Sequence, residues 1–299
     1  MYDIAIIGAG IAGLTSAIYA RRANKKVLVI EAKTYGGQII NTLKIQNYPA
    51  MPGVSGPDLA KKTYDQAVAL GTEFEFATVT EVKKSDKTFQ IKTDDGTYEA
   101  KSIIIATGTE EQKLGLPREE ALTGRGISYC ATCDGALYKN KPVAVVGGGN
   151  TALYDALYLS DIASKIYLVH RRDEFRGDAY LVDKLREKSH VEFVMSHVAS
   201  GIIGEEKVEA LIVKNSEGEE RTLEVSAIFV AVGKIPSTKL FENLVELNEK
   251  GYIVAGEDCK TSAEGVFVAG DCRTKNLRQL VTATADGAIA ADAAVNYLD

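Results

Sequence analysis

The sequence lacks the features that mark membrane-spanning and nucleic-acid-binding proteins. In its 299 residues no apolar run approaches the roughly 18 residues needed to cross a membrane. The net charge of −6 provides no broad basic surface, so binding to nucleic acid is not expected. The N-terminus has no basic segment or cleavage site of a secretion signal and runs directly into the strand-like Tyr2–Ile7. We therefore expect a cytoplasmic protein with one large domain or two medium-sized ones.

Cysteine and histidine are also scarce, with four and three residues respectively. Four cysteines are too few for a disulfide scaffold, and the cytosol disfavours permanent disulfides. Cys130 and Cys133 are close in the chain, whereas Cys259 and Cys272 are well separated. A structural zinc site needs four ligands, usually as two close pairs, and the histidines form no cluster with ligand spacing. No metal site is predicted, and redox chemistry is the favoured function of the close pair.

The chain does contain an internal repeat. Shifted by 139 residues, Ile4–Gly13 lies over Val143–Ala152 without a gap. Each copy reads as an apolar strand, a glycine-rich turn, a helix and a second strand, which is the βαβ dinucleotide-binding unit. The glycines permit a tight turn and close approach of a pyrophosphate to the start of the helix. The turn residues are Gly8, Gly10 and Gly13 in the first copy, and Gly147, Gly149, Asn150 and Thr151 in the second, where Ala152 replaces the third glycine.

The two copies differ at the end of the second strand. In the first copy this position is Glu31, whose carboxylate can accept hydrogen bonds from ribose hydroxyls. In the second copy it is His170, followed by basic residues that can bind a 2′-phosphate: Arg171, Arg172 and Arg176. The alternative is that these basic residues form a solvated turn. We expect the first copy to bind FAD and the second to prefer NADPH to NADH.

The order of the segments predicts an α/β fold with two Rossmann-like, three-layer dinucleotide-binding domains. The apolar strand in Val266–Asp271 belongs with the first copy, although the second copy lies between them. The NADPH-binding domain is therefore expected as an insertion that begins near Gly115–Pro117 and ends near Glu246–Gly251. The predicted boundaries are 1–114 and 247–299 for the FAD-binding domain and 115–246 for the NADPH-binding domain. The alternating segments Thr88–Lys92 and Glu209–Lys214 are expected to form a small antiparallel layer over each sheet.

The close cysteine pair lies about a dozen residues before the second glycine turn, and Asp134 follows it directly. If a short helix begins here, the spacing of Cys130 and Cys133 places both sulfurs on one face near its N-terminus. That end of a helix favours a thiolate, the reactive form of cysteine. Asp134 is within reach of a sulfur leaving group and can move a proton, or it can simply cap a helix or turn.

Together these features resemble the low-molecular-weight thioredoxin reductases of the pyridine nucleotide-disulfide oxidoreductases. The resemblance covers essentially the whole chain. Its most specific part is Cys-Ala-Thr-Cys-Asp-Gly inside the inserted domain, at residues 130–135. It implies additional contacts to FAD from Gly37, Gln38, Asn47, Val79, Thr107, Gly108, Gly270, Asp271, Arg278 and Gln279. It also implies a homodimer.

The resemblance implies a mechanism as well. NADPH reduces the flavin, and the reduced flavin reduces a disulfide between Cys130 and Cys133. Cys133 faces the flavin, Cys130 attacks the disulfide of thioredoxin, and Asp134 is the acid and base.

The sequence departs from the family pattern at three places. Tyr154 and Asp155 stand where a pair of glutamates is common. Ala136 and Leu137 replace bulky aromatics after the cysteine motif, and Leu277 replaces an aromatic before Arg278. The first change bears on nicotinamide docking, and the others bear on the partner surface and the flavin edge.

Other functions remain open. The same fold can reduce a glutaredoxin-like protein, a peroxiredoxin-linked carrier or a small disulfide. A flavin-dependent thiol oxidase is a second possibility, although it would not need the basic cluster that follows His170. A flavin-bearing redox sensor is a third, but no interaction tail supports it.

Overall fold

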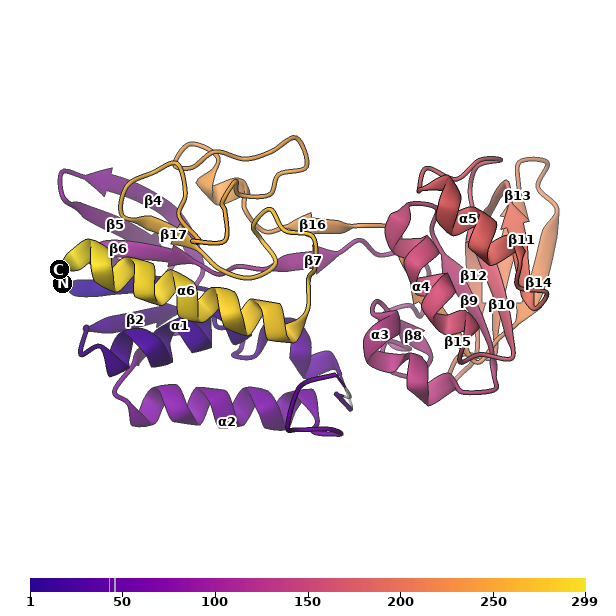
Figure 1. Ribbon diagram of the computed structural model, residues 1–299, viewed down its shortest axis with the longest axis horizontal. Helices are drawn as coiled ribbons and strands as arrows, with labels where there is room; N and C mark the ends of the chain where they lie inside the picture. Colours follow the sequence, from indigo (N-terminus) through magenta and orange to yellow (C-terminus); the bar gives the residue numbers. More distant parts are fainter. Residues whose placement is uncertain (43, 46) are drawn as a thin grey trace. The chain divides into compact units, whose positions relative to one another are not determined.

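The computed structural model describes residues 1–299 except residues 43 and 46. The chain folds into two compact units (Figure 1). The first unit comprises residues 1–43, 54–110 and 235–299, and the second comprises residues 44–53 and 111–234. Each unit has a largely parallel sheet with helices on one face, which confirms the predicted α/β fold class. No described helix is both long and apolar enough to span a membrane.

The first unit is built on a seven-stranded sheet of order β3-β2-β1-β6-β5-β4, with β17 also paired to β6. Its strands are β1 (Tyr2–Ile7), β2 (Val27–Ile30), β3 (Glu73–Glu75), β4 (Val79–Ser85), β5 (Thr88–Thr93), β6 (Thr97–Ile105) and β17 (Val266–Val268). The first half of β6 pairs antiparallel with β5, and most of its length pairs parallel with β1 and β17. The predicted antiparallel layer at Thr88–Lys92 is therefore present, but it continues the main sheet because β6 is long enough to join both parts.

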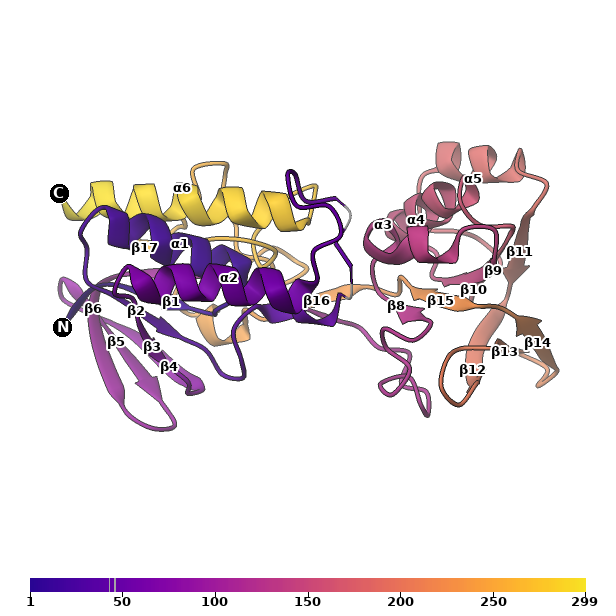
Figure 2. The ribbon, with the colours of Figure 1, turned by 90° about the horizontal axis from the view of Figure 1, so that it is seen from below.

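Alternation along the parallel strands determines the layers of the first unit. Ile4 and Ile6 pack among the helices, whereas Ala5 and Ile7 pack into a second core on the opposite face. The helices are α1 (Ile11–Arg22), α2 (Gly56–Ala69) and α6 (Leu280–Leu298), and Figure 2 shows them on one side of the sheet. Helix α1 is largely buried and packs against β1, α2 and α6, and α6 also contacts β6 and β17. A Cβ on Gly287 of α6 would lie 2.3 Å from the carbonyl oxygen of Ala12, so only glycine permits this close helix packing.

The second unit repeats this design. Its parallel sheet has the order β11-β10-β9-β15-β8, and a separate antiparallel sheet has the order β12-β13-β14. The strands are β8 (Ile127–Ser128), β9 (Pro142–Val146), β10 (Lys165–His170), β11 (Val191–Met195), β12 (His197–Ile203), β13 (Ala210–Asn215), β14 (Glu220–Glu224) and β15 (Ala227–Val230). Val143 and Val145 face helices α4 (Asn150–Ser160) and α5 (Ala179–Arg186), whereas Ala144 and Val146 face the antiparallel sheet. The antiparallel layer predicted at Glu209–Lys214 is thus confirmed.

Two of the chain connections between the units are β7 (Thr109–Glu111) and β16 (Lys234–Pro236), which pair with each other; the others flank residues 44–53. The chain therefore leaves the second unit at residues 234–235 and not near residue 246. The physical reason is that Phe241, the last residue of the short helix η3 (Lys239–Phe241), and Val245 are buried in the core of the first unit. The predicted start near Gly115–Pro117 is also a few residues late, because the second unit already begins at residue 111.

Candidate active site

The close cysteine pair forms a disulfide in the second unit. Cys130 and Cys133 are bonded to each other with their Cα atoms 5.3 Å apart. They follow strand β8 and belong to the start of the short helix α3 (Ala131–Asp134), with Cys130 as its N-cap residue, so the short helix considered in the sequence analysis is present. The next turn, η2 (Gly135–Tyr138), packs against α4. Among the described residues no cluster of acidic, histidine or cysteine side chains is suited to a metal ion.

Asp134 is partly buried and directly follows Cys133 of this disulfide. Its Oδ2 atom is 2.7 Å from the hydroxyl oxygen of Ser128. Burial raises the pKa of Asp134 above the usual value of an aspartic acid, and the hydrogen bond from Ser128 acts in the opposite direction. A carboxyl group whose pKa is raised holds a proton closer to neutral pH, as a proton donor to a sulfur leaving group must.

A buried glutamate anchors the segment that leads to the cysteines. The carboxylate of Glu119 accepts hydrogen bonds from the backbone N–H groups of Leu114, Gly115 and Leu116. It also accepts one at 2.8 Å from the hydroxyl of Tyr129, the residue before Cys130. Burial and this contact to Glu119 raise the pKa of Tyr129. The position of the disulfide segment is therefore fixed from both sides, by Glu119 before it and by α4 after it.

Neither Glu119 nor Ser128 was singled out by the sequence. Nothing in the pattern around Glu119 distinguishes it from other surface glutamates, because its partners converge only in the folded unit. Ser128 offered a weak signal, since its Oγ accepts a hydrogen bond from the N–H of Cys130 two residues later, which is the local turn that serine favours.

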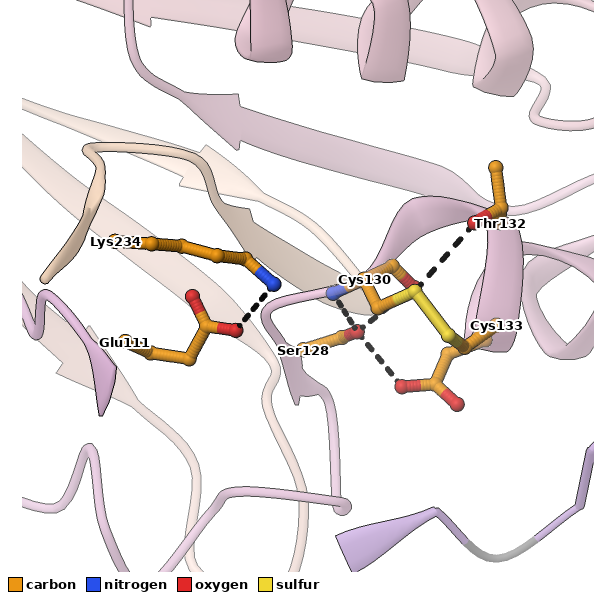
Figure 3. The surroundings of a disulfide bond; sticks show 7 residues. Glu111, Ser128, Cys130, Thr132, Cys133 and Lys234 are labelled. Carbon is orange, nitrogen blue, oxygen red and sulfur yellow. Dashed lines mark hydrogen bonds and ion pairs between the residues drawn. A yellow bond between two sulfur atoms is a disulfide. The ribbon is translucent and has the colours of Figure 1, made fainter. Parts of the chain in front are cut away.

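A second buried carboxyl group belongs to Asp155 on α4. Burial raises the pKa of Asp155 to about 7; Lys234 lowers it and Glu111 raises it. Lys234 and Glu111 form an ion pair of 2.9 Å at the two chain connections, and Figure 3 shows this pair in the surroundings of the disulfide. Of the two residues that depart from the family pattern, Asp155 is thus partly buried, whereas Tyr154 is 56% exposed.

The raised pKa of Asp155 leads to a prediction about stability. Between pH 4 and pH 7 the folded chain holds this proton more tightly than the unfolded chain, so the free energy of unfolding falls as pH rises through that window. We expect Asp155→Asn to remove this decline. The substitution should stabilise the protein by about 1–3 kcal/mol more at pH 8 than at pH 5, allowing for partial solvent screening.

Differential scanning calorimetry at both pH values measures this difference. The matched control is Asp161→Asn at the end of the same helix, where an exposed carboxylate pairs with Lys188. An equal change at both pH values for Asp155→Asn would contradict the prediction.

The first glycine turn has the geometry of a pyrophosphate cradle. A Cβ on Gly8 would lie 2.4 Å from the carbonyl oxygen of Ala106, and a Cβ on Gly13 would lie 1.9 Å from that of Gly8. Gly10, at the start of α1, has open space where its Cβ would be. Glu31 accepts hydrogen bonds of 2.8 Å from the N–H of Ala9 and 2.9 Å from that of Lys33, so its carboxylate lies at the turn. Backbone N–H groups at a helix start with free space above them fit a bound dinucleotide.

Several of the residues expected to contact FAD lie at the same edge of the first sheet. Gly37, in the short helix η1 (Gly37–Asn41), would place a Cβ 3.2 Å from the Cα of Gly10. The side-chain amide of Gln38 donates to the carbonyl of Thr109 at 2.8 Å, which fixes η1 next to the segment after β6. Thr107 and Gly108 are part of that segment, and Gly270 and Asp271 follow the parallel strand β17.

The segment after β17 is held by a buried ionic network. Arg273 and Asp286 are 2% and 3% exposed, and the Arg273 guanidinium contacts both carboxylate oxygens of Asp286 at 2.8 and 2.9 Å. Asp286 also accepts hydrogen bonds from the Lys275 ammonium at 2.7 Å and the N–H of Gly270 at 3.0 Å. Because Asp286 lies on α6, its contacts with Gly270, Arg273 and Lys275 hold residues 270–275 against that helix.

The remaining residues expected at FAD have different surroundings. Arg278 donates to the backbone carbonyls of Asp271 and Arg273 and lies 4.1 Å above the ring of Tyr252. Gln279 is the N-cap residue of α6. Val79 begins β4, in the antiparallel part of the sheet, and Asn47 lies in the segment 44–53 that belongs to the second unit.

The second glycine turn repeats the contacts of the first. A Cβ on Gly147 would lie 2.4 Å from the carbonyl oxygen of Ala231. The same distance separates a Cβ on Gly8 from the carbonyl oxygen of Ala106. Gly149 at the start of α4 has open space where its Cβ would be, as Gly10 has at the start of α1. Asn150 and Thr151 are the first residues of α4. Both turns therefore fit a dinucleotide in the same way.

The basic segment after β10 folds back onto this turn. The N–H of Arg176 donates to the carbonyl of Gly148 at 2.8 Å, and the guanidinium groups of Arg171, Arg172 and Arg176 belong to exposed residues. His170 differs from the arginines because it is buried and stacked on Phe175, with ring centroids 5.4 Å apart. Burial, and then the neighbouring arginines, lower the pKa of His170, so it packs beneath the turn as a neutral ring.

The whole chain matches known proteins. Residues 2–287 match the family model described as pyridine nucleotide-disulphide oxidoreductase. The chain is 42% identical to the thioredoxin reductase of Listeria monocytogenes, and the match covers 100% of this chain and 94% of that protein. It is also 42% identical to the thioredoxin reductase of Treponema pallidum, covering 100% of this chain and 97% of that protein. A crystal structure of thioredoxin reductase from Streptococcus pyogenes has a TM-score of 0.94 at 40% identity and covers 100% of this chain and 98% of that one.

The chain belongs to the pyridine nucleotide-disulphide oxidoreductase family. This confirms the predicted enzyme class, an oxidoreductase with a redox-active disulfide, and the predicted cofactors, FAD and NADPH. The close structural match also confirms the two Rossmann-like domains.

Proposed function

We propose that the protein is an NADPH-dependent thioredoxin reductase, in which electrons pass from NADPH through FAD and the Cys130–Cys133 pair to the disulfide of thioredoxin. The observation that carries this proposal is the disulfide in the second unit, next to the buried carboxyl of Asp134. The same unit contains the glycine turn with the basic segment. The relatives' shared activity supports thioredoxin as the acceptor.

The two units have separate roles in this proposal. The first unit holds FAD, with Gly8, Gly10 and Gly13 at the pyrophosphate and Glu31 at the ribose. The second unit holds NADPH at its own glycine turn, and Arg171, Arg172 and Arg176 contact the 2′-phosphate through exposed guanidinium groups that are free to form bidentate contacts. Bound FAD supplies the ability to accept a hydride from NADPH and to pass an electron pair to a disulfide.

The chain's own residues open and re-form one S–S bond. When an electron pair enters the disulfide, the S–S bond breaks and the sulfur of Cys130 leaves as a thiolate, whereas Cys133 would be the sulfur that faces the bound flavin. Asp134 gives this sulfur a proton, for which its buried position is suited. Asp134 takes this proton back when Cys130 attacks the disulfide of thioredoxin, and the first thioredoxin sulfur leaves. Cys133 then attacks the sulfur of Cys130 in the mixed disulfide, which re-forms the Cys130–Cys133 bond and releases the second thioredoxin sulfur, and both released sulfurs take up protons as thiols.

An anaerobic titration of the purified holoenzyme tests this function. NADPH should bleach the flavin absorbance with a lower half-saturating concentration than NADH, and oxidised thioredoxin should then restore the flavin absorbance. Restoration only by a glutaredoxin-like protein, or only by oxygen, would instead support another carrier or a thiol oxidase.

We also propose that the enzyme is a homodimer in the cytoplasm. Cys259 and Cys272 are both buried free thiols, which is the usual state of cysteine in a reducing compartment. Sedimentation equilibrium of the holoenzyme measures the oligomeric state directly.

A further inference from the structure

The hydroxyl group of Ser128 lies among three polar atoms of the cysteine segment. Its Oγ atom is 2.7 Å from Oδ2 of Asp134, 3.1 Å from the backbone nitrogen of Cys130 and 3.2 Å from the backbone oxygen of Cys130 (Figure 3). Ser128 is 4% exposed, so water does not replace these partners. All three contacts are made to residues that the reaction uses.

A serine hydroxyl has one hydrogen and two lone pairs, so it cannot donate to Asp134 and to the Cys130 carbonyl at the same time. Two arrangements satisfy the geometry. When Asp134 is ionised, Ser128 donates to its carboxylate and accepts from the N–H of Cys130. When Asp134 is protonated, its O–H donates to Ser128, which turns its own hydrogen to the carbonyl of Cys130. In both arrangements Asp134 keeps a hydrogen bond.

We propose that Ser128 is a positioning residue that keeps Asp134 hydrogen-bonded in both protonation states, so that the buried carboxyl can both hold and release its proton. This inference rests on the proposed function of Asp134 as the acid and base. When the disulfide opens, the electron pair breaks the S–S bond, and the proton moves from Asp134 to the leaving sulfur. Asp134 becomes a carboxylate, and the hydrogen of Ser128 turns from the Cys130 carbonyl to Oδ2 of Asp134.

The other groups around Asp134 do not supply this compensation. Its pKa is raised by burial and lowered by the hydrogen bond from Ser128. The titratable groups on neighbouring elements are the phenol of Tyr138 on η2 and, after reduction, the two thiols. Helix α4 contributes Tyr158, whose ring would lie 3.1 Å from a Cβ on Gly135. Lys141 is placed over the ring of Tyr138, 5.9 Å from its centroid. Ser128 is therefore the uncharged group whose hydrogen bond compensates for the cost of burying the ionised carboxylate of Asp134.

The test compares Ser128→Ala with wild type. In the holoenzyme reduced with dithiothreitol, the rate of Cys130 alkylation by iodoacetamide is measured from pH 5 to pH 10, with the labelled residue identified by mass spectrometry. The wild-type profile should contain a step from Asp134 in addition to that of the thiol. Ser128→Ala should move the Asp134 step to higher pH by about one unit, because the ionised form has lost its donor. The high-pH limb of turnover should move in the same direction.

Three further variants make the result specific. Ser160→Ala removes another buried hydroxyl of the same unit, one that donates to the carbonyl of Leu157, and should leave the profile unchanged. Ser128→Thr keeps a hydroxyl and should restore the wild-type profile. In an Asp134→Asn background the step should be absent, and Ser128→Ala should then have no further effect. If Ser128→Ala and wild type have the same profile, or if the shift persists in the Asp134→Asn background, the proposal is wrong. Because alkylation requires no NADPH, a failure of the proposed electron donor would be seen separately.

Discussion

Replacing either Cys130 or Cys133 by serine is expected to abolish reduction of thioredoxin, with a loss of at least about 10³-fold in turnover. A serine hydroxyl cannot form the S–S bond that accepts the electron pair, so no step after flavin reduction can proceed. The dinucleotide turns lie on other segments, and both variants should therefore retain FAD and still be reduced by NADPH. Flavin absorbance measures the retention of FAD, and stopped-flow mixing measures flavin reduction by NADPH. Steady-state NADPH oxidation with oxidised thioredoxin measures the loss of turnover.

The chain offers a matched control for these variants. Cys259 is a buried free thiol of the first unit, and burial raises its pKa to about 12, which makes it an unreactive packing residue. Cys259→Ala should keep thioredoxin turnover within about threefold of wild type, provided that the core tolerates the smaller side chain. Normal turnover in Cys130→Ser or Cys133→Ser would refute the redox assignment of the pair.

The second large effect is expected in the basic segment after β10. Arg171→Ala should raise the dissociation constant for NADPH by about ten- to a hundredfold, because one charged bidentate contact to the 2′-phosphate is lost. Replacing Arg171 and Arg172 together should raise the dissociation constant for NADPH by about 10²–10³-fold. NADH has no 2′-phosphate, and its dissociation constant should change by no more than about twofold. Isothermal titration calorimetry with both nucleotides measures the two constants on the same protein.

Arg186→Ala provides the comparison, since Arg186 is an exposed arginine of α5 that pairs with Asp183. It should alter neither constant. A loss of equal size for NADPH and NADH in Arg171→Ala would show that the segment does not recognise the phosphate. His170 is a separate case, because its neutral, buried ring packs against Gly148 and Phe175. Its replacement should therefore affect the folding of the turn and not the choice of nucleotide.

The fold could be predicted from the sequence wherever local patterns and covalent neighbours determine the structure. The repeat at Ile4 and Val143 identified both parallel sheets, because a glycine turn between an apolar strand and a helix has few structural solutions. The short helix after Cys130 was considered only as a condition, because no local pattern there requires it. The end of the inserted unit was placed too late, because nothing local in residues 235–246 indicates that Phe241 and Val245 are buried in the first unit.

The site was predictable only in part. The spacing of the two cysteines indicated redox chemistry, and the family resemblance implied the disulfide between them. The surroundings of Asp134 could not, because its burial, which raises its pKa, exists only once the cysteine segment packs in the folded unit, where Gly135 lies against Tyr158 and Leu159 of α4. The same holds for Asp155. Its pKa is raised mainly by burial, and the charged groups that modify it further, Lys234 and Glu111, lie 79 and 44 residues away in the chain (234 − 155 and 155 − 111). Long-range electrostatics of this kind has no signature in a local pattern.

The buried network of Asp286 affects how the protein gains its flavin. Residues 270–275 are fixed by contacts to the interior of the first unit that involve no ligand atom. Little conformational entropy is then lost in this segment when a cofactor binds, so more of the interaction energy contributes to affinity. In a newly synthesised chain this segment would thus adopt its final conformation before a cofactor binds.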